Sequence, residues 1–190
     1  MSSVGPNYCS TAVNDSSIGV VAWTGTLTNV GVPGGYPNSI SVEIYTGYFT
    51  TNYIKTSGYG FSIPTGATIT GISVDVNRDE DPGGSPIAAT DYAVRIVKGG
   101  VIGTTDNSSS TLWPLLATTE TYGSSSYLWG ESWTPSDINS SGFGFALAAQ
   151  TPGTDTIVEI NTIQITIYYT LTNGTLSNVS SMKNISSLTL

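Results

Sequence analysis

Hydrophobic and polar residues alternate with a period of two in several stretches of the chain. In residues 72–77, for example, Ile or Val occupies every even position and a polar residue every odd one. Similar alternation occurs in residues 40–44, 59–63, 92–96, 143–147 and 163–169. This period is typical of strands with one buried face, and no window has an apolar period of 3.6 over a useful length. The pattern therefore predicts an all-β protein.

Many short strands separated by Gly/Pro-rich turns indicate a two-layered fold. We predict a single antiparallel β-sandwich of jelly-roll type over residues 20–170, with less than a fifth of the domain in α-helix. The period-two runs place eight side chains in the interior: Ile72, Val74, Val76, Val94, Ile96, Phe145, Ile165 and Ile167.

The last apolar run changes parity. Val158 and Ile160 are even-numbered, whereas the apolar residues from Ile163 onward are odd-numbered. A strand cannot exchange its two faces without an extra residue. We therefore expect a bulge or corner near Asn161–Thr162.

Both ends of the chain differ from the middle. Residues 1–19 are mostly small and polar, which predicts an N-terminal arm, and residues 171–190 are rich in Ser, Thr and Asn. In this C-terminal segment an apolar residue occurs at every third position: Leu176, Val179, Met182, Ile185 and Leu188. Period three fits an extended threefold path or a small β-solenoid turn, and the composition also fits a disordered tail. We interpret the segment as an assembly arm whose five apolar side chains bind another subunit.

The charge of the chain excludes several partners. The net charge is −8, and the 5 cationic residues are scattered along the sequence. Nucleic-acid binding requires clustered cations, so we expect no nucleic-acid partner. There is no apolar run of membrane-spanning length and no basic, apolar leader at the N-terminus. We expect no membrane partner, and synthesis in a cytoplasm without a signal peptide.

The residue types argue against catalysis. The chain has no histidine, and its single cysteine, Cys9, has no histidine to activate it. We predict no catalytic residue, no cofactor, no metal ligand and no enzymatic activity.

One charge cluster, Arg78-Asp79-Glu80-Asp81, follows the strand that we expect to end at Asn77. Three consecutive carboxylates could contact calcium but cannot easily converge on one ion. We favour a solvated turn for Asp79–Asp81. Asp91 could pair with Arg78 or Arg95 at a strand edge, which is a structural role.

The most distinctive segment is aromatic. Tyr127, Trp129 and Trp133 occur within seven residues. Large aromatic side chains dominate core energetics, so these residues could close one end of the sandwich. Alternatively their faces could stack on sugar rings and form a glycan-binding site. The following Ser136–Asn139 is predicted to form a capped helical turn.

Five segments in order resemble a family of tailed-bacteriophage proteins. They are residues 52–64, 66–76, 127–140, 143–145 and 163–169, which include the strings Gly-Tyr-Gly-Phe-Ser-Ile-Pro and Leu-Trp-Gly-Glu-Ser-Trp-Thr-Pro-Ser-Asp-Ile-Asn. The resemblance covers roughly residues 20–170. It implies a virion surface component such as a head decoration protein, a head fibre or a tail-associated module, and it implies no catalytic residues.

These observations together predict a structural virion protein. We expect a capsid decoration (cement) or fibre subunit that assembles through its terminal arms, with copies of itself and other capsid or tail proteins as partners. The alternative is a carbohydrate- or receptor-binding module of a phage tail or fibre, with a host-surface glycan as ligand. Either would place the protein on the virion surface after synthesis in the host cytoplasm.

Overall fold

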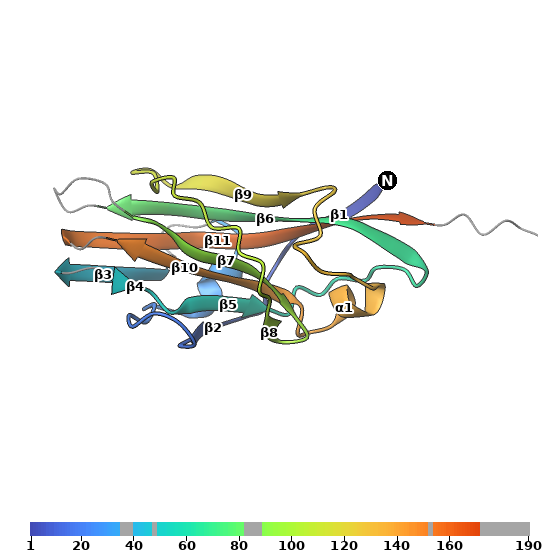
Figure 1. The fold of residues 1–190 in the computed structure, drawn as a ribbon, viewed down its shortest axis with the longest axis horizontal. Coiled ribbons are helices and arrows are strands. Elements are labelled where there is room, and N and C mark those ends of the chain that lie inside the picture. The colour runs from blue at the N-terminus through green and yellow to red at the C-terminus, as the bar shows by residue number, and fades with distance from the viewer. Residues whose placement is uncertain (35–39, 47–48, 82–88, 152–153, 172–190) are drawn as a thin grey trace, which may run out of the picture.

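The computed structural model describes residues 1–34, 40–46, 49–81, 89–151 and 154–171. Two antiparallel sheets pack face to face in this part of the chain (Figure 1). The first sheet contains β1 (Ser2–Tyr8), β3 (Ile40–Thr46), β6 (Ala67–Asp81), β9 (Thr118–Ser124) and β11 (Thr154–Leu171). The second contains β2 (Thr11–Asp15), β4 (Phe49–Thr50), β5 (Tyr53–Ser57), β7 (Thr90–Lys98), β8 (Val101–Ile102) and β10 (Gly144–Thr151). A 3-10 helix, η1 (Leu27–Gly31), and a short helix, α1 (Pro135–Asn139), complete the described elements.

Strand β11 organises the first sheet. It pairs with the whole of β6, from Leu171 opposite Ala67 to Ile157 opposite Asp81. β9 lies on the far side of β6 and ends the sheet there. β1 and β3 share the other side of β11, at its later and earlier residues respectively. The second sheet has the order β2-β5-β10-β7-β8, with β4 beside β10.

The core lies between the sheets and confirms the prediction of an antiparallel β-sandwich. All eight predicted interior side chains are at most 1% exposed. The only α-helix in the described residues is the five-residue α1. The jelly-roll type stays a prediction.

The predicted irregularity in the last strand is confirmed. The register between β11 and β6 shifts between Ile160 and Thr162. Ile160 and Ile163 are both fully buried, although their numbers differ in parity. The extra residue therefore keeps the apolar side chains of both halves of β11 in the core.

The N-terminal residues differ from the predicted arm. β1 pairs with β11 and β2 pairs with β5, so residues 2–15 contribute one strand to each sheet. Cys9, between the two strands, is 5% exposed, and Ala12 is 7% exposed. The correction has a simple cause: backbone hydrogen bonds can add a strand to a sheet edge without a row of large apolar side chains.

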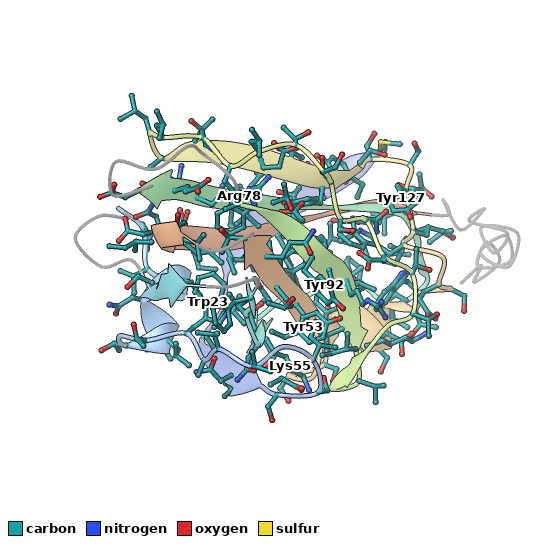
Figure 2. The ribbon with its side chains drawn as sticks, turned by 60° about the vertical axis from the view of Figure 1, so that its left-hand side comes forward. Trp23, Tyr53, Lys55, Arg78, Tyr92 and Tyr127 are labelled. Carbon is teal, nitrogen blue, oxygen red and sulfur yellow. The ribbon has the colours of Figure 1, made fainter. Side chains whose placement is uncertain are left out.

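The two ends of the sandwich are built differently. Trp133, just before α1, packs on Phe143, just after it, and the Phe143 ring also packs on Tyr59 and Phe61. Helix α1 lies at the end where β6 begins and β11 finishes. We call this the plug end (right in Figure 1). The opposite end, where β6 finishes and β9 begins, is called the loop end. In Figure 2, Arg78 lies toward the loop end and Tyr127 toward the plug end.

Candidate functional site

Two oppositely charged side chains meet between the sheets at the loop end. Arg78 on β6 and Asp91 on β7 are 1% and 4% exposed, and Arg78 Nη1 lies 2.6 Å from Asp91 Oδ1. Arg78 has the inward parity of Val76 on the same strand. Asp91 lies where the register between β7 and β10 shifts, so its position does not follow from simple alternation.

The Asp91 carboxylate has several further donors. Its Oδ1 accepts a hydrogen bond from Trp113 Nε1 at 2.9 Å. Its Oδ2 accepts from the Tyr122 hydroxyl at 2.9 Å and from the backbone N–H of Ser109 at 3.0 Å. Burial of a carboxylate costs free energy unless such donors replace water. This set of donors makes the buried charge tolerable.

Aromatic rings enclose the Arg78 guanidinium. Its central carbon lies 4.5 Å from the Trp113 ring centroid and 5.8 Å from the Tyr122 centroid, which is cation–π geometry. Burial raises the pKa of the Tyr122 hydroxyl, and the charge of Asp91 raises it further. Tyr122 therefore remains a neutral hydroxyl that can donate to Asp91. We call Arg78, Glu80, Asp91, Trp113 and Tyr122 the ionic cluster.

Glu80 corrects the prediction of a solvated turn at Asp79–Asp81. β6 continues through Asp81 because it stays paired with β11, and Glu80 is fully buried opposite Val158. Its Oε2 accepts a hydrogen bond from the N–H of Ala89 at 2.9 Å. The inward parity of Val76 thus extends through Arg78 to Glu80.

The ionic cluster holds the segment that leads into β9. The Trp113 N–H donates to Ala89 O at 2.9 Å, and the Glu80 N–H donates to Pro114 O at 2.8 Å. With the Ser109–Asp91 bond, these contacts fasten the segment to both sheets. The segment is therefore positioned by buried groups rather than by surface contacts.

Three leucines of this segment point to solvent. Leu112, Leu115 and Leu116 are 51%, 53% and 81% exposed, whereas Trp113 between them is fully buried. We call residues 112–116 the leucine loop. Exposed leucines cost free energy in water, and here they are held at a defined place by Trp113 and Pro114. No periodicity in the sequence marks them as exposed, although three leucines within five residues are unusual in so polar a chain.

The ionic cluster has a structural role, because its carboxylates already have hydrogen-bond donors within the protein. Asp91 is saturated with donors, and Glu80 is bonded to a backbone N–H. In the part of the chain that the structure describes, no three Cys, Asp or Glu side chains are placed to hold a metal ion. Cys9 is buried, which raises its pKa to about 11, so its thiol stays protonated near neutral pH.

The predicted glycan-binding residues lie elsewhere and are largely buried. Trp129 is fully buried and donates from Nε1 to Ile72 O at 3.1 Å. Trp133 is 9% exposed and packs edge-on against Phe143, with 5.4 Å between ring centroids. Tyr127 is half-buried, and its hydroxyl donates to Asn107 Oδ1 at 2.9 Å. The burial of Trp129 and Trp133 matches the interpretation that they close the sandwich, and it leaves no open indole face for a sugar ring.

The predicted partner-binding residues Leu176, Val179, Met182, Ile185 and Leu188 lie outside the described residues. Two open hollows occur on the described surface. One of about 380 Å³ is lined by Tyr8, Gly34, Asn77, Ala117, Thr119, Asn161 and Thr162. The other, of about 430 Å³, lies between residues 65–66 and α1 and is lined by Thr65, Gly66, Thr134, Pro135, Ser136 and Asn139. Neither hollow gathers charged side chains.

Comparisons with protein-family models, with curated proteins and with solved structures found no match for this chain. Neither helix of the described residues has the length and hydropathy of a membrane-spanning helix.

Proposed function

We propose that this protein is a structural component of a virion surface, either a capsid decoration subunit or a fibre subunit, and that it is not an enzyme. The observation that carries the proposal is the leucine loop. Soluble monomers rarely display grouped apolar side chains, and such groups mark interaction surfaces. A partner that covers Leu112, Leu115 and Leu116 gains the free energy of their burial.

The ionic cluster supports the same conclusion. A buried ion pair is a weak source of stability because desolvation offsets its attraction. Here the cluster positions the loop that carries the exposed leucines. Rigid presentation lowers the entropy lost on binding, which favours association with a partner.

The resemblance supports the virion assignment. The segments that carry it supply the buried rings of Tyr59, Phe61, Trp129, Trp133 and Phe143. The resemblance therefore concerns the framework of the sandwich, whereas the leucine loop lies outside the segments that carry the resemblance. A framework that resembles the family, combined with a contact loop outside the resemblance, suits a subunit that binds one particular partner in its assembly.

The glycan-binding alternative loses support at its predicted site. Stacking on a sugar needs an open aromatic face, and Trp129 and Trp133 are covered by protein. We therefore do not propose a glycan site at Tyr127, Trp129 and Trp133.

The test is quantitative mass spectrometry of virus particles purified from the source that carries this gene, followed by electron microscopy of the same particles. We expect the protein in many copies per particle and in a regular arrangement on the head or along a fibre. A few copies at a tail tip would favour a receptor-binding module. Absence from the particles would overturn the proposal.

A further inference from the structure

Among the described residues, the leucine loop lies beside a sheet edge that no further strand covers, called here the free edge. β9 begins two residues after Leu116 and ends the first sheet, with β6 on one side only. A strand at a sheet edge can pair with an added segment through its backbone N–H and C=O groups. An occupant of this surface therefore needs apolar side chains for the loop and a backbone able to run along β9.

The chain itself contains a segment with these properties. Residues 172–190 follow β11 and carry Leu176, Val179, Met182, Ile185 and Leu188 among Ser, Thr and Asn. They also contain Lys183 but none of the 13 acidic residues of the chain. Glu120 Oε2 on β9 lies 3.9 Å from Arg78 Nη2, and because the Glu120 side chain is 46% exposed, its carboxylate can also accept a hydrogen bond from this ammonium group.

The place where β11 ends favours binding between copies. Leu171 pairs with Ala67 at the plug end, whereas Arg78, eleven residues along β6, pairs with Thr118 at the start of β9. At about 3.3 Å per residue the separation is roughly 35 Å. A tail returning along its own copy would use about ten residues on the way, so Leu176 and Val179 would not reach the leucine loop. A tail that continues to a second copy can present all five apolar side chains.

We propose that residues 172–190 of one copy bind the leucine loop and the free edge of β9 on a second copy. This deepens the proposed function and rests on it, because it names how the subunits associate. The donor segment follows Leu171 at the plug end, whereas the leucine loop of the acceptor lies at the loop end, so the contact is heterologous. Repetition of a heterologous contact produces a ring or an open filament.

Two full-length variants separate donor from acceptor. The loop variant carries Leu115→Asp and Leu116→Asp and keeps the tail. The tail variant carries Val179→Asp, Met182→Asp and Ile185→Asp and keeps the loop. Val101→Asp is the matched control, because Val101 is 71% exposed but lies in β8, away from the leucine loop. Thermal melts establish that each variant is folded.

The measurement is sedimentation velocity over a range of protein concentrations. We expect the unmodified chain and Val101→Asp to form larger species as concentration rises, and each variant alone to stay monomeric. An equimolar mixture of the loop and tail variants should form a 1:1 pair and nothing larger, because only one intact donor and one intact acceptor can meet.

Four results would overturn the inference. Association of the tail variant alone would mean that the leucine loop binds a second leucine loop or another surface. A mixture that stays monomeric would indicate binding within one copy or a foreign partner, and so would a monomeric unmodified chain. Loss of association in Val101→Asp would show that the effect is not specific to the loop. None of these results depends on whether the protein is found in virus particles, so the proposed function fails or stands separately.

Discussion

Asp91 is the residue whose loss should damage the fold most. In Asp91→Ala the Arg78 guanidinium loses its 2.6 Å partner while it remains buried between the sheets. Removal of one partner of a buried ion pair costs about 3–5 kcal/mol of unfolding free energy. Urea unfolding measures the change. Asp15→Ala is the control, because its ion pair with Lys55 is partly exposed and should contribute about 0–1 kcal/mol. Equal losses in both variants would contradict this account of the cluster.

Tyr122→Phe tests a single hydrogen bond of the same cluster. The ring and its packing remain, but Asp91 Oδ2 loses the donor at 2.9 Å. A hydrogen bond to a charged group contributes about 1.5–3 kcal/mol. Because burial and Asp91 raise the pKa of Tyr122, the hydroxyl stays protonated and the loss should be the same at neutral and mildly alkaline pH. A difference that disappears at mildly alkaline pH would show that Tyr122 ionises in the folded protein.

Asp79 should oppose folding at neutral pH. Burial raises its pKa above the ordinary 3.8, although a hydrogen bond from Asn161 opposes this, and Asp81 raises it further. A carboxyl group whose folded-state pKa is raised loses stability as the pH rises above its unfolded pKa. Asp79→Asn should therefore melt higher than the unmodified protein near pH 7. The difference in melting temperature between the two proteins should be small below pH 3.8. It should grow as the pH rises from 3.8 to the raised pKa of Asp79. A gap that does not change with pH would contradict this prediction.

At the residue scale, the sequence predicted one charged pair but not where in the fold this pair lies. It allowed a pair between Asp91 and Arg78, but at a strand edge rather than in the core. The strand was predicted to end at Asn77 rather than at Asp81, because Asp79, Glu80 and Asp81 have low strand propensity. Arg78 and Glu80 continue the even-numbered, inward-facing positions of Val74 and Val76, and this parity indicates that the strand continues. This parity predicts the burial of both charged groups only once their partners are known, which are the Asp91 carboxylate for Arg78 and the Ala89 N–H for Glu80.

At the scale of elements, the segment 59–63 shows how alternation can be right while the strand is absent. Tyr59, Phe61 and Ile63 are all buried, as their spacing predicts, yet the segment belongs to no strand. At Ile63 the backbone bonds to a side chain instead of to a neighbouring strand. Asn139 of α1 accepts from the Ile63 N–H at 2.7 Å and donates to Ile63 O at 2.9 Å.

Asn139→Ala should therefore loosen the plug end. Two hydrogen bonds are lost and both backbone groups of Ile63 lose their partner, at a cost of about 1–3 kcal/mol. Asn139→Asp keeps an acceptor for the Ile63 N–H but loses the donor, so its cost should be intermediate. Chemical unfolding of the three proteins gives the order. An Asp variant as unstable as the Ala variant would show that the donor to Ile63 O carries the whole effect.

The strands differ in how clearly their own side chains predict them. β6, β7, β10 and β11 each have an apolar face toward the core, and β7 and β10 also bury small apolar residues on their second face: Ala93, Val97, Ala146 and Ala148. The bulge of β11 follows from its change of parity. β1 and β2 lack such a face, because their place in the sheets depends on backbone pairing with β11 and β5. Short polar strands of this kind are recognisable only once their neighbours are known.

At the scale of the whole molecule, the sandwich follows from the chain's strongest signal, its period-two runs. The leucine loop does not, because no periodicity distinguishes a leucine held outward from one that packs in the core. Trp113 is buried with its indole N–H on Asp91, and the leucines on either side of it are exposed. The candidate site is thus a product of tertiary contacts between β6, β7 and the segment before β9.

The C-terminal residues 172–190 should contribute to assembly and not to the stability of a single copy. β11 ends at Leu171, which is 52% exposed, so removal of residues 172–190 leaves the described strands intact. We expect the melting temperature of the dilute monomer to be almost unchanged by the deletion. Association should be lost, because five apolar side chains that gain about 1.5–3 kcal/mol each when fully covered are removed.

The entropy of ordering sets how strong that association is. Fixing the backbone costs about 1–2 kcal/mol per residue, which offsets much of the burial in any single contact. Binding between two copies should be weak, and repetition in an assembly should strengthen it by raising the effective concentration of each tail. A shorter deletion, of residues 187–190, removes only Leu188 of the five and should weaken association less than the full deletion. Calorimetry of the dilute proteins and sedimentation at high concentration test both parts. A large drop in melting temperature would show that the segment belongs to the fold of its own copy, and unchanged association would show that it takes no part in assembly.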